Sequence, residues 1–234
     1  MDKLYIVIPA YNEEENIEAV AREWHEVAVK SGEESRLVVI NDGSKDNTYA
    51  KLKKLQAELP QLEAVTKPNG GHGATVLYGY RYALEHSADF VFQTDSDGQT
   101  LPSEFWQLWE ARNQFDIQIG FRKGRQDGFS RVLVTKTLKL VLFLQFRIWI
   151  TDANTPFRLM SVQSLQQILP RIPAEHNLAN VLLTVLYHKE KKNIKYTPIT
   201  FRPRQGGVNS INFKKIIKIG WKAVKDFASL KKSL

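Results

Sequence analysis

The 234-residue chain contains no cysteine. This absence excludes disulfides, thiolate zinc sites and cysteine nucleophiles, and it fits a protein of the reducing cytoplasm. The chain also lacks an uninterrupted membrane span, because the apolar-rich segment 131–150 is broken at Lys136, Lys139, Gln145 and Arg147. The N-terminal segment has neither the length nor the polar n-region of a signal peptide. We therefore expect a cytoplasmic protein.

The composition favours a folded chain with anionic partners. A hydrophobic content of 43% and an aromatic content of 11% suffice for a sizeable core and argue against global disorder. The formal net charge is +8, and lysines and arginines crowd after Gly120 and after Lys189. Phosphate-rich substrates, nucleic acids and anionic membranes all favour such a surface.

The first 120 residues alternate short apolar segments with longer amphipathic ones. We expect strands at Leu4–Pro9, Arg36–Asn41, Leu62–Lys67, Asp89–Thr94 and Asp116–Gly120. We expect helices between them, beginning near Asn12, at Asp46 or Asn47, and after the glycine-rich turn Pro68–Gly73. This order predicts an α/β fold, in which helices cover both faces of a mostly parallel sheet.

Ligands of such sheets bind beyond the carboxyl ends of the strands. The loops expected at this edge are Pro9–Glu13, Asn41–Asp46, Lys67–Gly73 and Thr94–Gln99. They contain most of the unusual polar chemistry of the first half, which predicts a single site at this edge.

The second half follows a different pattern. We expect one long helix at 131–150, a helix at Asn177–Lys189, a strand at Ile194–Thr200 and a basic amphipathic helix at Phe213–Lys232. No linker rich in proline, glycine or serine divides the chain into separate domains.

Two carboxylates and a carboxamide stand at alternate positions, Asp95, Asp97 and Gln99, directly after the fourth expected strand. In a tight turn they can direct three oxygens at one Mg²⁺ or Mn²⁺ ion, and such an ion would neutralise charge on a departing diphosphate. The alternative is an ordinary surface turn, in which aspartate and glycine are common. The position after a buried strand, beside three other unusual loops, favours the metal site.

Four motifs in this order resemble the family 2 glycosyltransferases, whose fold is of the GT-A type. The motifs are Ile6–Glu13, Val39–Ser44, Asn69–Gly73 and Asp95–Gln99. The D-x-D-x-Q spacing of the last motif resembles the dolichyl- and polyprenyl-phosphate sugar synthases. The resemblance implies one GT-A domain at 1–211, with a donor half at about 1–120 and an acceptor half at 121–211. Residues 212–234 would form a basic C-terminal helix, part of that domain or appended to it.

The resemblance also implies a set of donor-binding residues. Pro9, Tyr11 and Glu13 would line the nucleotide pocket, Asp42 would address the base, and Asp95 and Ser96 would contact the nucleotide. Arg204 and Ser210 would contact the diphosphate from a glycine-containing lid at 202–210, in which Ile211 replaces the lysine of the family motif. Two alternatives stay open: Tyr11 as a packing aromatic, and Glu13 as a residue that serves only the helix start.

On the acceptor side, Gly120–Arg122 resembles the G-S-R element of the lipid-phosphate branch. The resemblance implies that Arg122 and Arg131 bind an acceptor phosphate, which suits paired guanidinium donors. Residues 152–158 resemble a D-x-x-x-G-F-R element, with Pro156 in place of the glycine. Asp152 and Arg158 are therefore expected on the acceptor side, with a structural ion pair as the alternative for Arg158.

The identity of the acceptor decides whether a base is needed. A sugar hydroxyl must lose a proton, and Glu175 or Asp152 would then be the base. A phosphate monoester is already ionised near neutral pH and needs positioning instead. The arginines favour transfer of a hexose from a UDP- or GDP-sugar to a polyprenyl phosphate. Asp97, Asp152 and Glu175 are the candidate catalytic residues, with Asp97 acting through the metal.

The alternatives are transfer to a saccharide hydroxyl, a basic nucleic-acid-binding protein, and an inactive scaffold. No recognition helix or RNA-stacking motif is present, so nucleic acid is not an expected partner. The amphipathic face of Phe213–Lys232 predicts peripheral contact with an anionic membrane at its inner face, or else packing on the domain.

Overall fold

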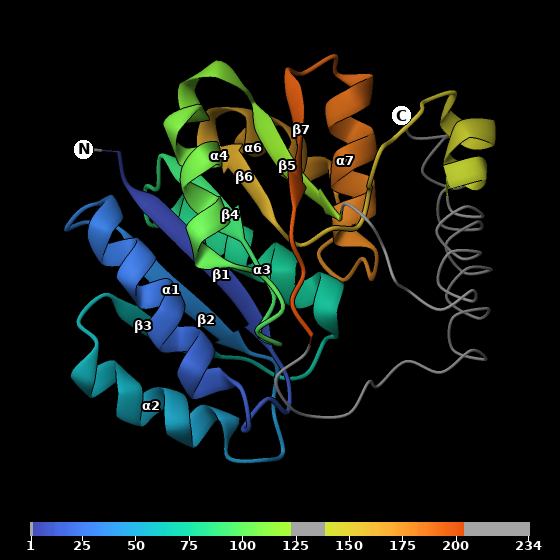
Figure 1. Cartoon of the computed structure of the whole chain (residues 1–234). Helices are drawn as coiled ribbons and strands as arrows, with labels where there is room; N and C mark the ends of the chain where they lie inside the picture. The colour runs from blue at the N-terminus through green and yellow to red at the C-terminus, as the bar shows by residue number, and fades with distance from the viewer. Residues whose placement is uncertain (1, 123–138, 204–234) are drawn as a thin grey trace.

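The computed structural model describes residues 2–122 and 139–203, and it shows one seven-stranded sheet with helices on both faces (Figure 1). The strand order is β3-β2-β1-β4-β6-β5-β7. The strands are β1 Leu4–Ala10, β2 Arg36–Asn41, β3 Leu62–Thr66, β4 Phe90–Gln93, β5 Ile117–Arg122, β6 Arg158–Ser161 and β7 Ile194–Ile199. Among these, β6 alone runs antiparallel to its two neighbours, β4 and β5. The expected α/β fold, in which helices cover both faces of a mostly parallel sheet, is confirmed.

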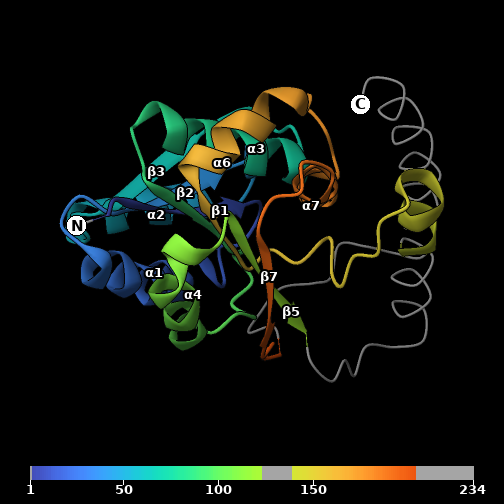
Figure 2. The same ribbon diagram turned by 90° about the horizontal axis from the view of Figure 1, so that it is seen from above.

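The helices divide between the two faces of the sheet (Figure 2). Helices α1 (Ile17–Ser31), α2 (Thr48–Glu58) and α4 (Trp106–Glu110) pack in one hydrophobic cluster with alternate residues of β1. Helices α3 (His72–Glu85), α6 (Val162–Ile168) and α7 (Ala179–Lys189) pack in a second cluster with the intervening residues of β1. Every residue of β1 is buried, because successive side chains point to opposite, covered faces.

The aromatic core beneath the metal-loop candidate is built from three separate parts of the chain. The ring of Trp24 in α1 lies 5.2 Å from that of Phe92 in β4 and 6.2 Å from that of Phe157. The rings of Phe92 and Phe157 meet edge to face at 4.8 Å. Tilted and edge-to-face pairs of this kind stabilise a core beyond their buried area. They fix β4, and with it the position at which the loop of Asp95 begins.

Several expected boundaries change in the structure. The first helix begins at Ile17 rather than near Asn12, because Asn12 adopts a left-handed backbone with φ 53°. The expected long helix at 131–150 is helical over 139–146 and ends before Arg147, whose φ is 59°. Its first residues, 131–138, lie outside the described chain. So do the expected helix Phe213–Lys232 and the expected domain boundary at 211.

The sequence pattern did not predict β6, α4 or α6. Strand β6 is short, and it begins at the charged Arg158, so it lacks the apolar alternation of a strand. The helix at 139–146 packs on α7 through Leu142 and Phe146, which contact the cluster of Val181 and Val185. Within the described ranges, no helix combines the length and the apolarity that crossing a bilayer requires.

Candidate active site

Hydrogen bonds join the first and second predicted loops at the carboxyl edge of the sheet. The backbone N–H of Asn12 donates to Ser44 Oγ (3.0 Å), and the backbone N–H of Lys45 donates to Asn12 Oδ1 (2.9 Å). The backbone N–H of Glu13 donates to Thr48 Oγ1 at the start of α2 (2.8 Å). The left-handed conformation of Asn12 therefore serves to join the two loops.

Asp42 organises the third loop. Its carboxylate accepts hydrogen bonds from the backbone N–H groups of Gly70 and Gly71, both at 2.9 Å, and from Lys67 Nζ. The side chain is almost completely buried, and Asn69 donates to the Asp42 carbonyl (2.8 Å). Both carboxylate oxygens are thus bound to protein donors. The expected contact of Asp42 with a nucleotide base stays a prediction.

The metal-loop candidate follows β4 as a closed turn. Thr94 Oγ1 and Thr100 Oγ1 lie 2.7 Å apart at its base, and Gly98 takes a φ of 70° at its tip. The backbone N–H of Gln99 donates to Asp97 Oδ1 (3.1 Å). This hydrogen bond between two predicted ligands stabilises the turn that contains Asp95, Asp97 and Gln99.

One carboxylate oxygen of Asp95 is a candidate metal ligand. Its side chain is 32% exposed, but Oδ1 is buried and has no hydrogen-bond partner among the described residues. His72 Nε2 lies 3.9 Å from this oxygen. Burial raises the pKa of Asp95; His72 and Arg122 oppose that rise, and Asp97 adds to it.

An unpaired buried acceptor costs free energy, and a cation would satisfy it. Two carboxylates and a carboxamide offer the oxygen ligands that Mg²⁺ and Mn²⁺ prefer. In the described part of the chain, no group of three His, Cys, Asp or Glu side chains is placed to hold a metal ion. The oxygen-bearing side chains of Asp95, Asp97 and Gln99 fit a hard divalent ion, and such an ion could take its remaining ligands from the oxygens of a bound substrate.

Arg202 is a residue of this site for which the sequence predicted no role of its own: it begins the expected lid at 202–210, in which Arg204 is the predicted diphosphate contact. It follows β7, and its guanidinium contacts Gly98 O and Glu23 of α1. Its backbone N–H donates to Gln99 O (2.9 Å), and Gln99 Nε2 donates to Arg202 O (3.3 Å). The sequence does not show these contacts, because the partners of Arg202 come from α1 and from the loop after β4.

The expected donor residues Pro9, Tyr11, Glu13 and Ser96 lie at this same edge. Pro9 and Ser96 are buried, and Tyr11 is 43% exposed. Glu13 Oε2 accepts a hydrogen bond from Asn16 Nδ2 (2.8 Å), so Glu13 supports the start of α1. Their contacts with a nucleotide stay predictions. Arg204 and Ser210 lie outside the described residues.

Arg122 lies near the metal-loop candidate, and its predicted contact with an acceptor phosphate stays a prediction. It ends β5, its guanidinium carbon lies 3.8 Å from the centre of the Phe201 ring, and its charge acts on Asp95. Arg122 therefore stands on the same side of the sheet as the metal-loop candidate. The second predicted arginine, Arg131, lies outside the described residues.

Arg158 corrects the sequence-based expectation. The side chain is fully buried at the start of β6, and its guanidinium donates to Ala153 O, Thr155 O, Asn180 O and Thr184 Oγ1. An acceptor phosphate has no access to it. Its donors are taken up by the backbone carbonyls of Ala153, Thr155 and Asn180 and by the Thr184 hydroxyl.

The two candidate bases differ in their surroundings. Asp152 is half-buried, its Oδ1 accepts the backbone N–H of Asn154 (3.1 Å), and its charge acts on Arg158. Glu175 is exposed, in the segment before α7. A Cβ on Gly73 would lie 2.2 Å from His176 O, so this segment packs against the first turn of α3.

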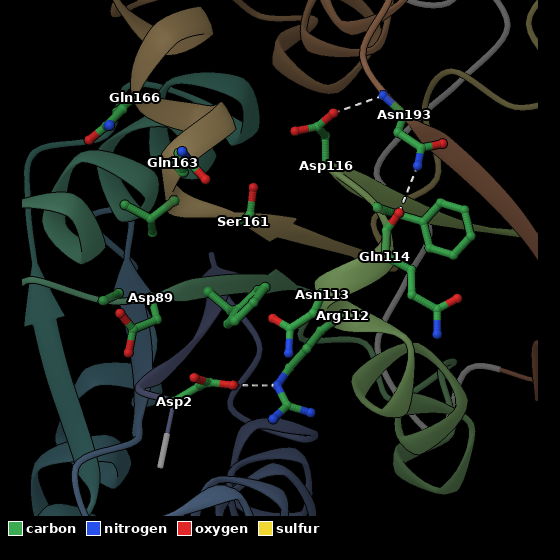
Figure 3. Close-up of a pocket in the computed structure, with 14 residues that line it drawn as sticks. Asp2, Asp89, Arg112, Asn113, Gln114, Asp116, Ser161, Gln163, Gln166 and Asn193 are labelled. Atoms are coloured by element: carbon green, nitrogen blue, oxygen red, sulfur yellow. Dashed lines mark hydrogen bonds and ion pairs between the residues drawn. The ribbon is translucent and has the colours of Figure 1, made fainter.

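A pocket of about 550 Å³ lies at the other end of the strands, where the parallel strands begin (Figure 3). Its acidic side chains already have partners: Asp2 pairs with Arg112, Asp89 accepts the backbone N–H of Lys3, and Asp116 accepts that of Asn193. These residues stand at the amino ends of parallel strands, away from Asp95–Gln99. We therefore do not assign the chemistry to this pocket.

The model of the family described as Glycosyl transferase family 2 matches residues 5–169. The chain is 26% identical over 219 residues to the UDP-N-acetylglucosamine–dolichyl-phosphate N-acetylglucosaminyltransferase of Methanococcus voltae, covering 85% of each chain. It is 25% identical over 217 residues to the undecaprenyl-phosphate mannosyltransferase of Micrococcus luteus, covering 90% of this chain and 88% of that protein.

Among solved structures, the fold is similar to that of the glucosyl-3-phosphoglycerate synthase of Mycobacterium tuberculosis in complex with Mn²⁺, UDP-glucose and phosphoglyceric acid. The TM-score is 0.70 at 17% identity, and the match covers 99% of this chain and 80% of that one. The family match includes β1 to β6, and with them the three loops and the carboxylate turn described above. The chain is therefore a member of glycosyl transferase family 2.

Proposed function

We propose that this chain is an inverting, metal-dependent hexosyltransferase. It moves a hexose from a nucleotide-diphosphate sugar to a polyprenyl phosphate at the inner face of a membrane. The observation that supports this most directly is the buried Oδ1 of Asp95, which has no hydrogen-bond partner among residues 2–122 and 139–203, at the end of the sheet where the donor loops converge. The names of the two relatives, which act on dolichyl and undecaprenyl phosphate, support the acceptor.

Asp95, Asp97 and Gln99 are the proposed ligands of Mg²⁺ or Mn²⁺. A similar fold is known with Mn²⁺ and UDP-glucose bound, which supports a divalent ion beside a UDP-sugar. When bound, such an ion would supply charge neutralisation for the leaving diphosphate. The donor itself, a UDP- or GDP-hexose, is proposed to lie over Pro9, Tyr11, Glu13, Asp42 and Ser96, with Arg204 and Ser210 on its diphosphate.

The chain's own residues would act mainly by positioning the reactants. Arg122, with Arg131, is proposed to hold the acceptor phosphate so that one of its oxygens faces the anomeric carbon of the sugar. The new carbon–oxygen bond forms as the bond to the diphosphate breaks, with inversion at that carbon. Because the phosphate oxygen is already ionised, no protein group has to remove a proton.

An exposed apolar face supports peripheral contact with an anionic membrane. Leu140, Leu144 and Trp149 are 54%, 59% and 70% exposed, and the rings of Phe143 and Trp149 stack at 4.8 Å. The opposite side of the same segment packs on α7. Apolar side chains beside Lys139 and Arg147 suit the boundary between acyl chains and anionic headgroups.

The exposed Glu175 favours a second candidate, transfer to a saccharide hydroxyl, since a hydroxyl acceptor needs a base. A product assay with UDP- and GDP-hexoses, Mn²⁺, and either undecaprenyl phosphate or free saccharides separates the two. We expect a lipid-linked product, and turnover of Glu175→Gln within about twofold of wild type. Product on saccharide alone, abolished by Glu175→Gln, would overturn the polyprenyl phosphate proposal.

A further inference from the structure

Arg202 connects the metal-loop candidate to two distant elements. One arm of its guanidinium donates to Gly98 O inside the loop, and the other pairs with Glu23 of α1. The Arg202 and Glu23 side chains are 26% and 34% exposed, so the pair is largely shielded from solvent. The neighbouring residues Phe201 and Thr100 form a bridge between the same two segments. The carboxylate turn is thus fastened to the end of β7 as well as to β4.

The backbone of Arg202 fixes the orientation of the Gln99 carboxamide. A backbone carbonyl can only accept a hydrogen bond, so the atom that faces Arg202 O must be the nitrogen of the Gln99 amide. The Gln99 Oε1 atom therefore points away from Arg202. The reciprocal bond from the Arg202 N–H to Gln99 O holds the backbone of the two residues together. Because the amide nitrogen is bound to Arg202 O, the carboxamide is held in one of its two flipped orientations, and its oxygen stays available to bind a metal ion.

We propose that Arg202 is a positioning residue, which holds Gln99 and the Gly98 peptide in the geometry that binds the divalent ion. Arg202 touches neither the ion nor the substrate; it acts through Gln99. This inference rests on the proposed metal site at Asp95, Asp97 and Gln99. Groups that orient metal ligands in this way typically change metal affinity by roughly 10- to 100-fold when they are removed.

The sign of the effect separates positioning from simple electrostatics. Arg202 is a cation, and removing a cation near a metal site strengthens metal binding if charge alone matters. Positioning predicts the opposite, because Arg202→Gln removes the side-chain donor to the carbonyl of Gly98, the residue before Gln99, and the pair with Glu23, while the backbone bonds to Gln99 remain. Arg202→Lys keeps the charge but loses the two directional donors. Both variants should therefore weaken binding of the ion.

The test is a Mn²⁺ titration followed by electron paramagnetic resonance, with a saturating nucleoside diphosphate present. The matched control is Arg112→Gln. Arg112 and its partner Asp2 are 25% and 35% exposed, and Arg112 also donates to a backbone carbonyl, that of Trp109. This pair, shown in Figure 3, lies at the amino ends of the parallel strands, away from the metal-loop candidate.

We expect Arg202→Gln and Arg202→Lys to raise the Mn²⁺ dissociation constant at least about tenfold, and Arg112→Gln to leave it within about twofold. In a Gln99→Ala background, Arg202→Gln should add less than about a twofold change, because the ligand it positions is gone. Unchanged or tighter Mn²⁺ binding by folded Arg202→Gln would overturn the positioning role. A wild-type protein that transfers sugar but binds no Mn²⁺ would overturn the metal site and this inference together.

Discussion

Replacing Gly73 by alanine would place a methyl group against the backbone of a distant segment. Gly73 lies in the first turn of α3, and a Cβ there would lie 2.2 Å from His176 O and 2.5 Å from Asn177 O. Ordinary contact begins near 3.4 Å, so the opposing backbone must retreat by about 1 Å. Backbone carbonyls cannot rotate aside as the end of a side chain can.

Two effects of opposite sign determine how Gly73→Ala changes the free energy of unfolding. Alanine favours a helix over glycine by up to about 1 kcal/mol, which would stabilise the variant. Overpacking a close-packed site costs about 1 to 3 kcal/mol, and a clash with backbone belongs at the upper end. We expect a net destabilisation of about 2 kcal/mol, which lowers the Tm of a chain of this size by roughly 4 to 8 °C.

Thermal and urea unfolding followed by tryptophan fluorescence would measure this loss. Glu85→Ala is the control, because Glu85 lies exposed in the last turn of the same helix, and its replacement should change stability by only a few tenths of a kcal/mol. A Gly73→Ala protein as stable as wild type would refute the close approach of α3 to the segment that includes Glu175 and His176.

Three further predictions concern the metal loop, pH and the membrane. Asp97→Ala should lower metal-dependent turnover roughly 100-fold or more while the Tm stays near wild type; retained turnover would contradict the ligand assignment. Burial lowers the pKa of His188 below its usual 6.5, so the stability linked to its neutral form is present above pH 6.5 and is lost as the pH falls further. Urea unfolding across that range should show a smaller loss for His188→Gln than for wild type. Leu144→Glu should weaken flotation with anionic vesicles about tenfold, and equal flotation would exclude this face from the contact.

The sequence predicted the bounds of the first three strands to within one residue, because each strand is a short apolar segment that can be recognised without its neighbours in space. Strand β2 has the predicted bounds, and β1 and β3 differ by one residue, because short apolar runs between amphipathic segments report burial directly. The placement of Asp95–Gln99 followed from the same pattern, since the loop after a buried parallel strand must lie at the carboxyl edge.

Contacts between distant segments were beyond the sequence pattern. Arg158 was expected to bind phosphate, but the carbonyls of Ala153, Thr155 and Asn180 gather around it in the interior. Asp42 has both oxygens bound by the loop that contains Lys67 and the following glycines. In both residues the charge was visible in the sequence, and only the fold showed which donors or acceptors surround it.

The sequence by itself determined the family, the α/β order of strands and helices, and the carboxylate turn with its metal-binding composition. These features depend on residue type and spacing along one segment. Only the tertiary structure decided that Arg158 is interior, that Arg122 stands near Asp95, and that Gln99 is hydrogen-bonded to Arg202 beyond the end of β7. The physical reason is that hydrogen bonds and burial depend on distance in space, and folding brings together residues that the sequence keeps far apart.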